Sequence, residues 1–403
     1  MSNQMEEAKV QRGSFQLMKS VNKSIILNKI RTSEPISRAQ IAKETKLTPP
    51  TVSSIVKELI EEGIVRESEL GESSGGRKPT MLLINSDAFY VIGVDAGPET
   101  IECIIADLTG KIMERTSSKL SKPLTNDLFL SILKENIHKL IQVSRVSLEK
   151  MIGIGVAMHG VVNVETGMSL VAPNLSLTNI PIRKELEKEF NLMVKVENDA
   201  RAMALGESWF GGHGDVDSMV VVNLGRGVGS GMVVNGKLYH GAHDIAGEIG
   251  HITIDIHGDI CACGNRGCLQ TFATGEAIAE RARKSIGAVS SAFTGEDVYK
   301  QAEAGNDAFV KVLQETGVII GIGLTNLIHL INPRKIVLGG GVMLSEKYIL
   351  PSILQTIEER ALTPDAKQTE VTVTKLGGDA TLLGAVSLLL IELFDPVKIA
   401  EAQ

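Results

Sequence analysis

The residue types best suited to chemistry gather in one short segment, residues 247–270. It contains one histidine, His251, and three cysteines, Cys261, Cys263 and Cys268. One imidazole nitrogen and three thiolate sulfurs form the ligand set of a structural zinc site, which is tetrahedral and closed to water. The chain has only four cysteines, so this clustering favours a metal site over three unconnected thiols. We therefore predict a bound zinc ion with a structural role.

Polar side chains that suit sugar binding flank the predicted metal ligands. Glu248 precedes His251 by three residues, and Gln270 closes the segment. Sugar hydroxyls both donate and accept hydrogen bonds, so carboxylates, amides and imidazoles recognise them well. Asn198 and Asp199 directly follow a predicted strand and form a second such group. The alternatives are a helix N-cap for Asp199 and a solvated loop acid for Glu248.

Length and composition describe a globular protein of two or three domains. The chain has 403 residues, 43% hydrophobic and 22% charged, with a net charge of −7. The N-terminus lacks the apolar core of a signal peptide, and no uninterrupted apolar run is long enough to cross a membrane. Few cysteines suit a reducing compartment. We expect a cytoplasmic protein without a membrane span.

The N-terminal part, residues 1–85, resembles a DNA-binding module in its pattern of helices. It is slightly basic, whereas the rest of the chain is acidic. Ser37 and Thr48 are expected to cap two successive helices, and Gly63 to end the second, which predicts a helix-turn-helix. The alternative is a small helical bundle that contacts another protein. Because the start of the last helix enters the major groove, the predicted DNA contacts here are Ser37, Arg38, Thr48, Pro50, Thr51, Ser53, Ser54 and Lys57.

A winged extension is predicted next. Residues 64–69 and 80–85 alternate like two strands around a loop rich in glycine and serine. Gly76 allows a close backbone approach, and Arg77 and Lys78 are long enough to reach phosphates or a narrow minor groove. The alternative is a flexible linker.

The body, residues 86–403, alternates strands and helices according to a plan that occurs twice. Residues 90–97 form a buried strand and a glycine turn, and residues 218–234 repeat this arrangement. Repeated alternation predicts an α/β fold with two lobes and a cleft between them.

The motifs of head and body together resemble the ROK family of repressors and sugar kinases, in its xylose-repressor and N-acetylglucosamine-repressor branch. The resemblance covers nearly the whole chain. It implies an actin/hexokinase-like fold with a sugar between the lobes, and it adds Asn174 to the candidate sugar residues. The motifs that carry it are ISRAQIAKETKLTPPTVSSIVKEL, SSGGRKP, END, AGEIGH and CACGNRGC.

Two phosphate loops of the kinase members are altered here. Where those kinases resemble D-x-G-G-T, this chain has Pro98, which lacks an N–H, and Glu99, whose charge repels phosphate. Arg226 replaces a small hydroxyl residue in the second loop. The glycines of residues 225–231 precede a strand and not a helix, so we predict a hairpin and no dinucleotide site. Kinase activity is not expected.

Two further departures concern the sugar cleft. Gln270 stands where many members have a glutamate, which removes a charge-assisted hydrogen bond. His159 stands where relatives usually have a proline. We interpret His159 as a tolerated turn residue, and a position lining the cleft is the alternative.

The sequence thus predicts a repressor of a carbohydrate operon that a sugar releases from its operator. We expect a homodimer or higher homo-oligomer on double-stranded operator DNA. The rival is an ATP-dependent sugar kinase with an added DNA-binding head, and an activator or a repressor relieved by a partner protein also fits. The sugar remains open among pentoses, hexoses and short oligosaccharides.

Overall fold

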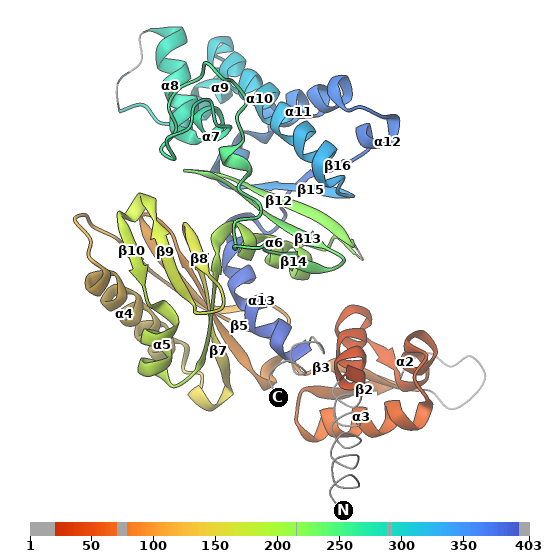
Figure 1. The fold of residues 1–403 in the computed structure, drawn as a ribbon. Helices are drawn as coiled ribbons and strands as arrows, with labels where there is room; N and C mark the ends of the chain where they lie inside the picture. Colours follow the sequence, from red (N-terminus) through yellow and green to blue (C-terminus); the bar gives the residue numbers. More distant parts are fainter. Residues whose placement is uncertain (1–20, 71–78, 215, 288–289, 291, 395–403) are drawn as a thin grey trace, which may run out of the picture.

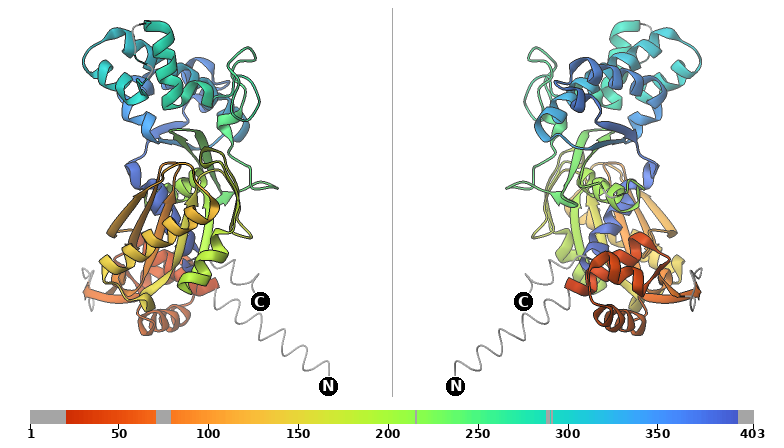
Figure 2. Two further views of the ribbon diagram at one scale, coloured as in Figure 1. Left: turned by 90° about the vertical axis from the view of Figure 1, so that its left-hand side faces the viewer. Right: turned by 90° about the vertical axis from the view of Figure 1, so that its right-hand side faces the viewer.

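The computed structural model describes residues 21–70, 79–214, 216–287, 290 and 292–394. Figure 1 shows a head and two lobes, with the first lobe between the head and the second lobe's outer helices. The side views in Figure 2 place the head at the opposite end of the molecule from those outer helices.

The head is a winged helix-turn-helix, as predicted. Ser37 Oγ accepts a hydrogen bond from Gln40 N at 3.2 Å, and Thr48 Oγ1 accepts one from Thr51 N at 3.4 Å, so both predicted caps form. The wing residues Gly76, Arg77 and Lys78 lie outside the described residues. The strand order is β1-β3-β2. The elements are helical residues 21–33, β1 (Ile36–Ser37), α2 (Arg38–Thr45), α3 (Pro49–Glu61), β2 (Val65–Leu70) and β3 (Thr80–Ile84).

The first lobe is built on a five-stranded sheet of order β11-β7-β4-β5-β6. Helices α4 and α5 cover one face, and α13 covers the other. A small sheet, β10-β9-β8, follows β7 and was not predicted from the sequence. The elements are η1 (Ser86–Ala88), β4 (Tyr90–Ala96), β5 (Thr100–Asp107), β6 (Ile112–Lys119), α4 (Asn126–Ser144), η2 (Leu148–Lys150), β7 (Met151–Met158), β8 (Val161–Asn163), β9 (Met168–Ala172), η3 (Pro173–Leu175), β10 (Leu177–Ile180), α5 (Ile182–Phe190), β11 (Met193–Asn198) and α13 (Ala380–Phe394).

The second lobe repeats this topology with the order β14-β13-β12-β15-β16. In each sheet, two antiparallel pairings are followed by two parallel ones. The predicted repeat is therefore confirmed. The elements are α6 (Asp199–Phe210), β12 (Ser218–Leu224), β13 (Val228–Val234), β14 (Lys237–Tyr239), η4 (Ile249–His251), α7 (Gln270–Ala273), α8 (Gly275–Ile286), α9 (Gly295–Glu303), α10 (Asp307–Ile331), β15 (Lys335–Gly339), η5 (Gly341–Ser345), α11 (Glu346–Arg360), α12 (Pro364–Lys367), β16 (Glu370–Val373) and η6 (Gly377–Asp379).

The two lobes meet through α6 and α13. Helix α6 packs on the sheet of the second lobe, α13 packs on the sheet of the first, and the two helices pack on each other. A Cβ atom at Gly384 would lie 1.8 Å from Ala202 O, and one at Gly206 would lie 2.3 Å from Ala380 O. Only glycine permits so close an approach of the two backbones. The lobes therefore join through two helices in direct backbone contact.

Helix α10 and residues 377–394 are long and apolar enough to cross a membrane. In their most apolar windows, 56% and 61% of the residues are buried inside the molecule. Burial of this kind is typical of core helices in a folded protein.

Candidate functional site

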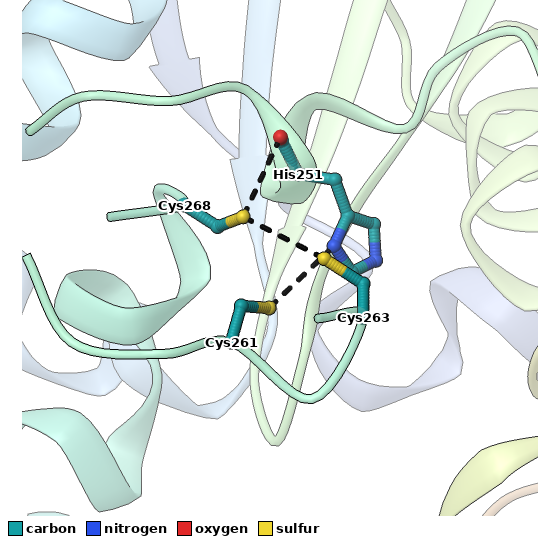
Figure 3. A group of neighbouring side chains, drawn as sticks. All are labelled: His251, Cys261, Cys263 and Cys268. Atoms are coloured by element: carbon teal, nitrogen blue, oxygen red, sulfur yellow. Dashed lines mark hydrogen bonds between the residues drawn. The ribbon is translucent and has the colours of Figure 1, made fainter. Parts of the chain in front are cut away.

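The four predicted metal ligands come together in the structure (Figure 3). Their ligand atoms all lie within 4.8 Å of one another. Cys261 Sγ is 3.7 Å from His251 Nδ1, and Cys263 Sγ is 3.7 Å from Cys268 Sγ. Zn–S bonds of about 2.3 Å in a tetrahedron place ligand atoms about 3.8 Å apart. The donor set and its spacing therefore fit a zinc ion.

Short backbone bridges hold the ligand loop. Thr253 pairs with Cys268 and Ile260 pairs with Arg266, each as an isolated antiparallel bridge. Gly267 has φ +62°, and a Cβ there would lie 1.6 Å from Asp255 O, so this turn requires glycine. The loop geometry thus brings ligands from both ends of the segment to one point.

Two side chains, Glu248 and Gln270, lie next to the predicted metal ligands. His251 directs Nδ1 at the cysteines, while its Nε2 lies 3.9 Å from Glu248 Oε2. Gln270 Nε2 donates a hydrogen bond to Cys261 Sγ at 3.1 Å. A hydrogen bond to a metal ligand orients that ligand, and the bond from Gln270 to Cys261 also orients Gln270 itself, whereas Glu248 at 3.9 Å makes no hydrogen bond to His251.

A cavity of about 530 Å³ opens between the lobes beside the metal ligands. Cys261 and Cys263 contribute to its wall. All the sugar residues predicted from the sequence line this one cavity: Asn174, Asn198, Asp199, Glu248, His251 and Gln270.

Asn198 and Asp199 share the start of α6 but differ in function. Asn198 Oδ1 caps the helix by accepting from Ala200 N and Arg201 N, and its Nδ2 donates to Gly160 O at 2.9 Å. Its polar atoms are thus engaged within the protein. Asp199 Oδ1 accepts from Ala200 N at 2.9 Å, and its Oδ2 faces the cavity wall near His159. The N-cap suggested for Asp199 is therefore supplied by Asn198.

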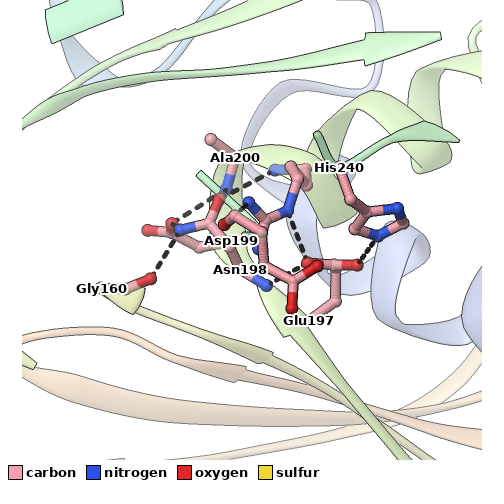
Figure 4. Close-up of polar contacts among 8 residues, drawn as sticks. Gly160, Glu197, Asn198, Asp199, Ala200 and His240 are labelled. Atoms are coloured by element: carbon pink, nitrogen blue, oxygen red, sulfur yellow. Dashed lines mark hydrogen bonds and ion pairs between the residues drawn. The ribbon is translucent and has the colours of Figure 1, made fainter. Parts of the chain in front are cut away.

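The residue before them, Glu197, anchors the loop that leads to Glu248 (Figure 4). Its carboxylate is buried and bonds Arg201 Nε and His240 Nε2, each at 2.7 Å, while Arg201 Nη1 donates to Asp244 O at 2.6 Å. Burial alone would raise the pKa of Glu197, but the bonds from His240 and Arg201 lower it. A buried carboxylate that is bonded by a guanidinium and an imidazole stays ionised and holds both segments in place.

Two residues outside the predicted sugar set also line the cavity: His159, for which a position lining the cleft was the alternative, and Asp95. His159 Nε2 lies 2.9 Å from Asn174 Nδ2, and its side chain is only 17% exposed. The interpretation of His159 as a mere turn residue is therefore wrong. Asp95 was considered only as part of an altered phosphate loop, yet it lines the same cavity.

Asp95 gives a testable pH dependence. Burial, followed by repulsion from Asp199, raises its pKa to about 7. Because the pKa of Asp95 is higher in the folded than in the unfolded protein, protonated Asp95 favours the folded state at low pH. This contribution to the free energy of unfolding is lost as the pH rises toward 7. We expect Asp95→Asn to be more stable than the wild type, by a margin that is about 1–3 kcal/mol larger at pH 8 than at pH 5. Urea unfolding at both pH values measures this margin, and an equal margin would contradict the assignment.

The two altered phosphate loops contact each other across the cleft. Arg226 Nη2 forms an ion pair with Glu99 Oε1 at 2.5 Å. Pro98, Glu99 and Arg226 line a second, larger cavity of about 930 Å³ that adjoins the first. The Glu99 carboxylate offsets the charge of Arg226 where a phosphate would bind. The predicted hairpin of β12 and β13 is present.

The recognition helix α3 exposes a polar face. Val52, Ile55, Val56 and Leu59 are buried on its inner side. Pro50, Ser53, Ser54 and Lys57 are exposed on the other side, and Thr51 is half-buried. Arg38 pairs with Glu67 of the wing strand at 2.8 Å. The predicted contacts Pro50, Ser53, Ser54 and Lys57 therefore share one exposed side of α3, whereas Ser37 and Arg38 lie before and at the start of α2.

Known proteins resemble both parts of the chain. Residues 91–392 match the model described as the ROK family, and residues 26–66 match a winged helix-turn-helix DNA-binding model. The xylose repressor of Caldicellulosiruptor bescii is 32% identical over 388 residues, which cover 94% of this chain and 97% of that repressor. The DNA-binding transcriptional dual regulator NagC of Escherichia coli K12 is 31% identical over 356 residues, 87% of each chain.

One solved structure matches nearly the whole chain, and another matches only its body. A ROK family transcriptional regulator, a homologue of the E. coli MLC protein, superposes with a TM-score of 0.83 at 30% identity over 96% of this chain and all of its own. A ROK family glucokinase from Streptomyces griseus, solved with glucose and AMPPNP, gives 0.67 at 27% identity and covers 74% of this chain and 98% of its own. The chain belongs to the ROK family.

Proposed function

We propose that the protein is a sugar-responsive repressor that binds operator DNA through its head and a sugar in the cavity between its lobes. Bound sugar lowers its affinity for DNA and so releases a carbohydrate-utilisation operon. The relatives named as repressors and regulators of xylose and other sugars support this function. The sugar is a pentose, a hexose or a short oligosaccharide.

One observation carries the proposal: helix α6 reaches from the sugar cavity to the DNA-binding head. Asp199 at its first position lines the cavity. Near its other end, Trp209 lies under Arg31 of the head, with the guanidinium carbon 4.1 Å from the ring centroid. The helix has 12 residues, which makes it about 18 Å long. A displacement of Asp199 toward a ligand therefore moves the surface on which the head rests.

The contact between head and body is partly buried and specific. Trp209 packs edge-on against Phe394 with ring centroids 5.7 Å apart, and Asn28 Nδ2 of the head donates to Phe394 O at 2.8 Å. Burial lowers the pKa of Arg31. Cation–π contacts of this kind contribute about 0.5–2 kcal/mol, which is the same scale as the 1–3 kcal/mol coupling usual between two ligand sites.

The remaining assignments complete the proposal. Zinc held by His251, Cys261, Cys263 and Cys268 is structural and fixes the wall of the sugar cavity. The protein acts in the cytoplasm as a homodimer or higher homo-oligomer, and its DNA-binding and sugar-binding units meet near residue 85. The DNA contacts are those of α3, the preceding turn, the start of α2 and the wing.

The protein is a regulator and not an enzyme. Its whole length aligns with regulators, whereas the glucokinase aligns with the body alone. Incubation with ATP, magnesium and a panel of hexoses and pentoses tests this statement. Phosphorylation of a sugar that disappears in Asp199→Asn would show a kinase.

Trp209→Leu tests the connection through α6. We expect operator affinity without sugar, and sugar affinity without DNA, to stay within about threefold of the wild type. The ratio of operator affinities without and with sugar should fall about fivefold or more, because the cation–π contact is lost. Fluorescence anisotropy of labelled operator measures all three quantities.

Tyr239→Leu is the matched control, since Tyr239 is half-exposed on β14 of the second lobe. Tyr239→Leu should leave the ratio of operator affinities without and with sugar unchanged. A full sugar response in Trp209→Leu would show that the signal travels elsewhere.

A further inference from the structure

His159 lies between two of the candidate sugar residues. Its Nε2 is 2.9 Å from Asn174 Nδ2, and its Nδ1 is 3.5 Å from Asp199 Oδ2. The three side chains come from the end of β7, from η3 and from the start of α6. The imidazole therefore joins three separate segments at the cavity wall.

The backbone around His159 keeps the ring in this place. His159 N donates to Ala96 O at 3.3 Å, and Gly160 O accepts from Asn198 Nδ2 at 2.9 Å. Gly160 has φ +95°, and a Cβ there would lie 2.2 Å from Val171 O. The turn that carries His159 is therefore held on both sides at the cavity wall.

The hydrogen bonds of the ring determine which atoms its neighbours offer to a ligand. Nδ2 of the Asn174 amide faces Nε2 and can only donate to it, so a neutral ring accepts there and carries its proton on Nδ1, on the side of the Asp199 carboxylate. The side-chain oxygen of Asn174 remains available to accept a hydrogen bond from a ligand, and so do the carboxylate oxygens of Asp199. Without the imidazole, the side-chain amide of Asn174 could flip. The flip would exchange the positions of its NH2 donor and its oxygen acceptor.

We propose that His159 is a positioning residue that sets the sugar specificity of this cavity. It fixes two neighbouring acceptors, one on Asn174 and one on Asp199, and so selects a ligand with two adjacent hydroxyl groups in matching orientation. An epimer or deoxy analogue leaves one acceptor without a donor, which costs binding free energy. This inference rests on the proposed function of the cavity.

Isothermal titration calorimetry tests it on the full-length protein. The probes are D-xylose, D-glucose and N-acetyl-D-glucosamine, each with its epimers and deoxy analogues. For the sugar that the wild type binds best, we expect a preference over its epimers of about tenfold or more. In His159→Ala this preference should fall below about threefold.

Conservative variants separate positioning from simple folding. His159→Asn retains an N–H directed at Asp199, and His159→Gln retains a group that reaches Asn174. Each should restore part of the preference, whereas a merely structural role predicts equal preference in all variants with the same melting temperature. These two variants replace His159→Ala in the comparison if its melting temperature falls.

An unchanged preference in His159→Ala, or a preference that neither conservative variant restores, would overturn the inference and leave the proposed function intact. A wild-type protein that binds no sugar of the panel would contradict both. Binding that has no effect on operator affinity would contradict the proposed function alone.

Discussion

Replacing Cys263 by serine is expected to remove the metal ion and, with it, the response to sugar. Cys263 is the exposed member of the cluster, so this change deletes a ligand without opening the core. Loss of one of four ligands should weaken metal affinity by a factor of at least about 100, since structural zinc is bound by about 10–16 kcal/mol in total. Without the ion, the three remaining ligands and the loop of residues 247–270 are no longer held at one point.

The effect should reach the sugar because the metal ligands and the cavity share side chains. His251 would ligate the metal through Nδ1 while its Nε2 faces Glu248, and Gln270 donates to Cys261. We expect sugar affinity to fall at least about tenfold and the melting temperature to fall with it. Metal analysis of the purified protein and sugar calorimetry provide the two measurements.

Cys103→Ser is the matched control, since Cys103 is buried in the first lobe away from the cluster. It should retain one zinc ion per chain and normal sugar affinity. If Cys263→Ser lost its metal but kept the sugar response, the cluster would only stabilise the fold.

Introducing a negative charge on α3 is expected to weaken specific DNA binding. Ser54 is exposed on the polar face of the recognition helix, next to the buried Ile55. Ser54→Glu would place a carboxylate among phosphates and base edges, and loss of such a contact costs about 1–3 kcal/mol. We expect operator affinity to fall at least about tenfold, with sugar affinity unchanged.

Ser131→Glu makes the same charge change on an exposed position of α4, in the first lobe. Its operator affinity should equal that of the wild type at the same salt concentration. Equal operator affinity in Ser54→Glu would exclude α3 from the DNA contact and leave the head as a module for protein contact.

Long elements with clear end signals were predictable from the sequence. Helix α10 has Asn306 as its N-cap and Asn332 in the left-handed conformation after its end. The caps at Ser37 and Thr48 were predicted for the same reason: a side-chain acceptor before a helix satisfies free N–H groups. The small sheet β10-β9-β8 was missed because its strands are short and lack a regular alternation of polar and apolar residues.

The cluster of His251 and the three cysteines was predictable because cysteine clustering is a strong local signal. The roles of the side chains that line the sugar cavity were harder to assign, since these roles depend on contacts between segments that are distant in the sequence. Asn198 turned out to cap α6, and His159 meets Asn174 and Asp199 only once the fold is formed. The contact of Arg31 with Trp209 has no counterpart in any local pattern.

The central claim is that sugar in the cavity between the lobes weakens DNA binding by the head. Operator DNA selected by the protein from a random pool of duplexes, labelled and titrated with protein at fixed salt, gives an operator affinity with and without each sugar. The account predicts that at least one sugar lowers this affinity about 5- to 150-fold, corresponding to 1–3 kcal/mol, and that Asp199→Asn loses the effect. An operator affinity unchanged by every sugar that binds would contradict it.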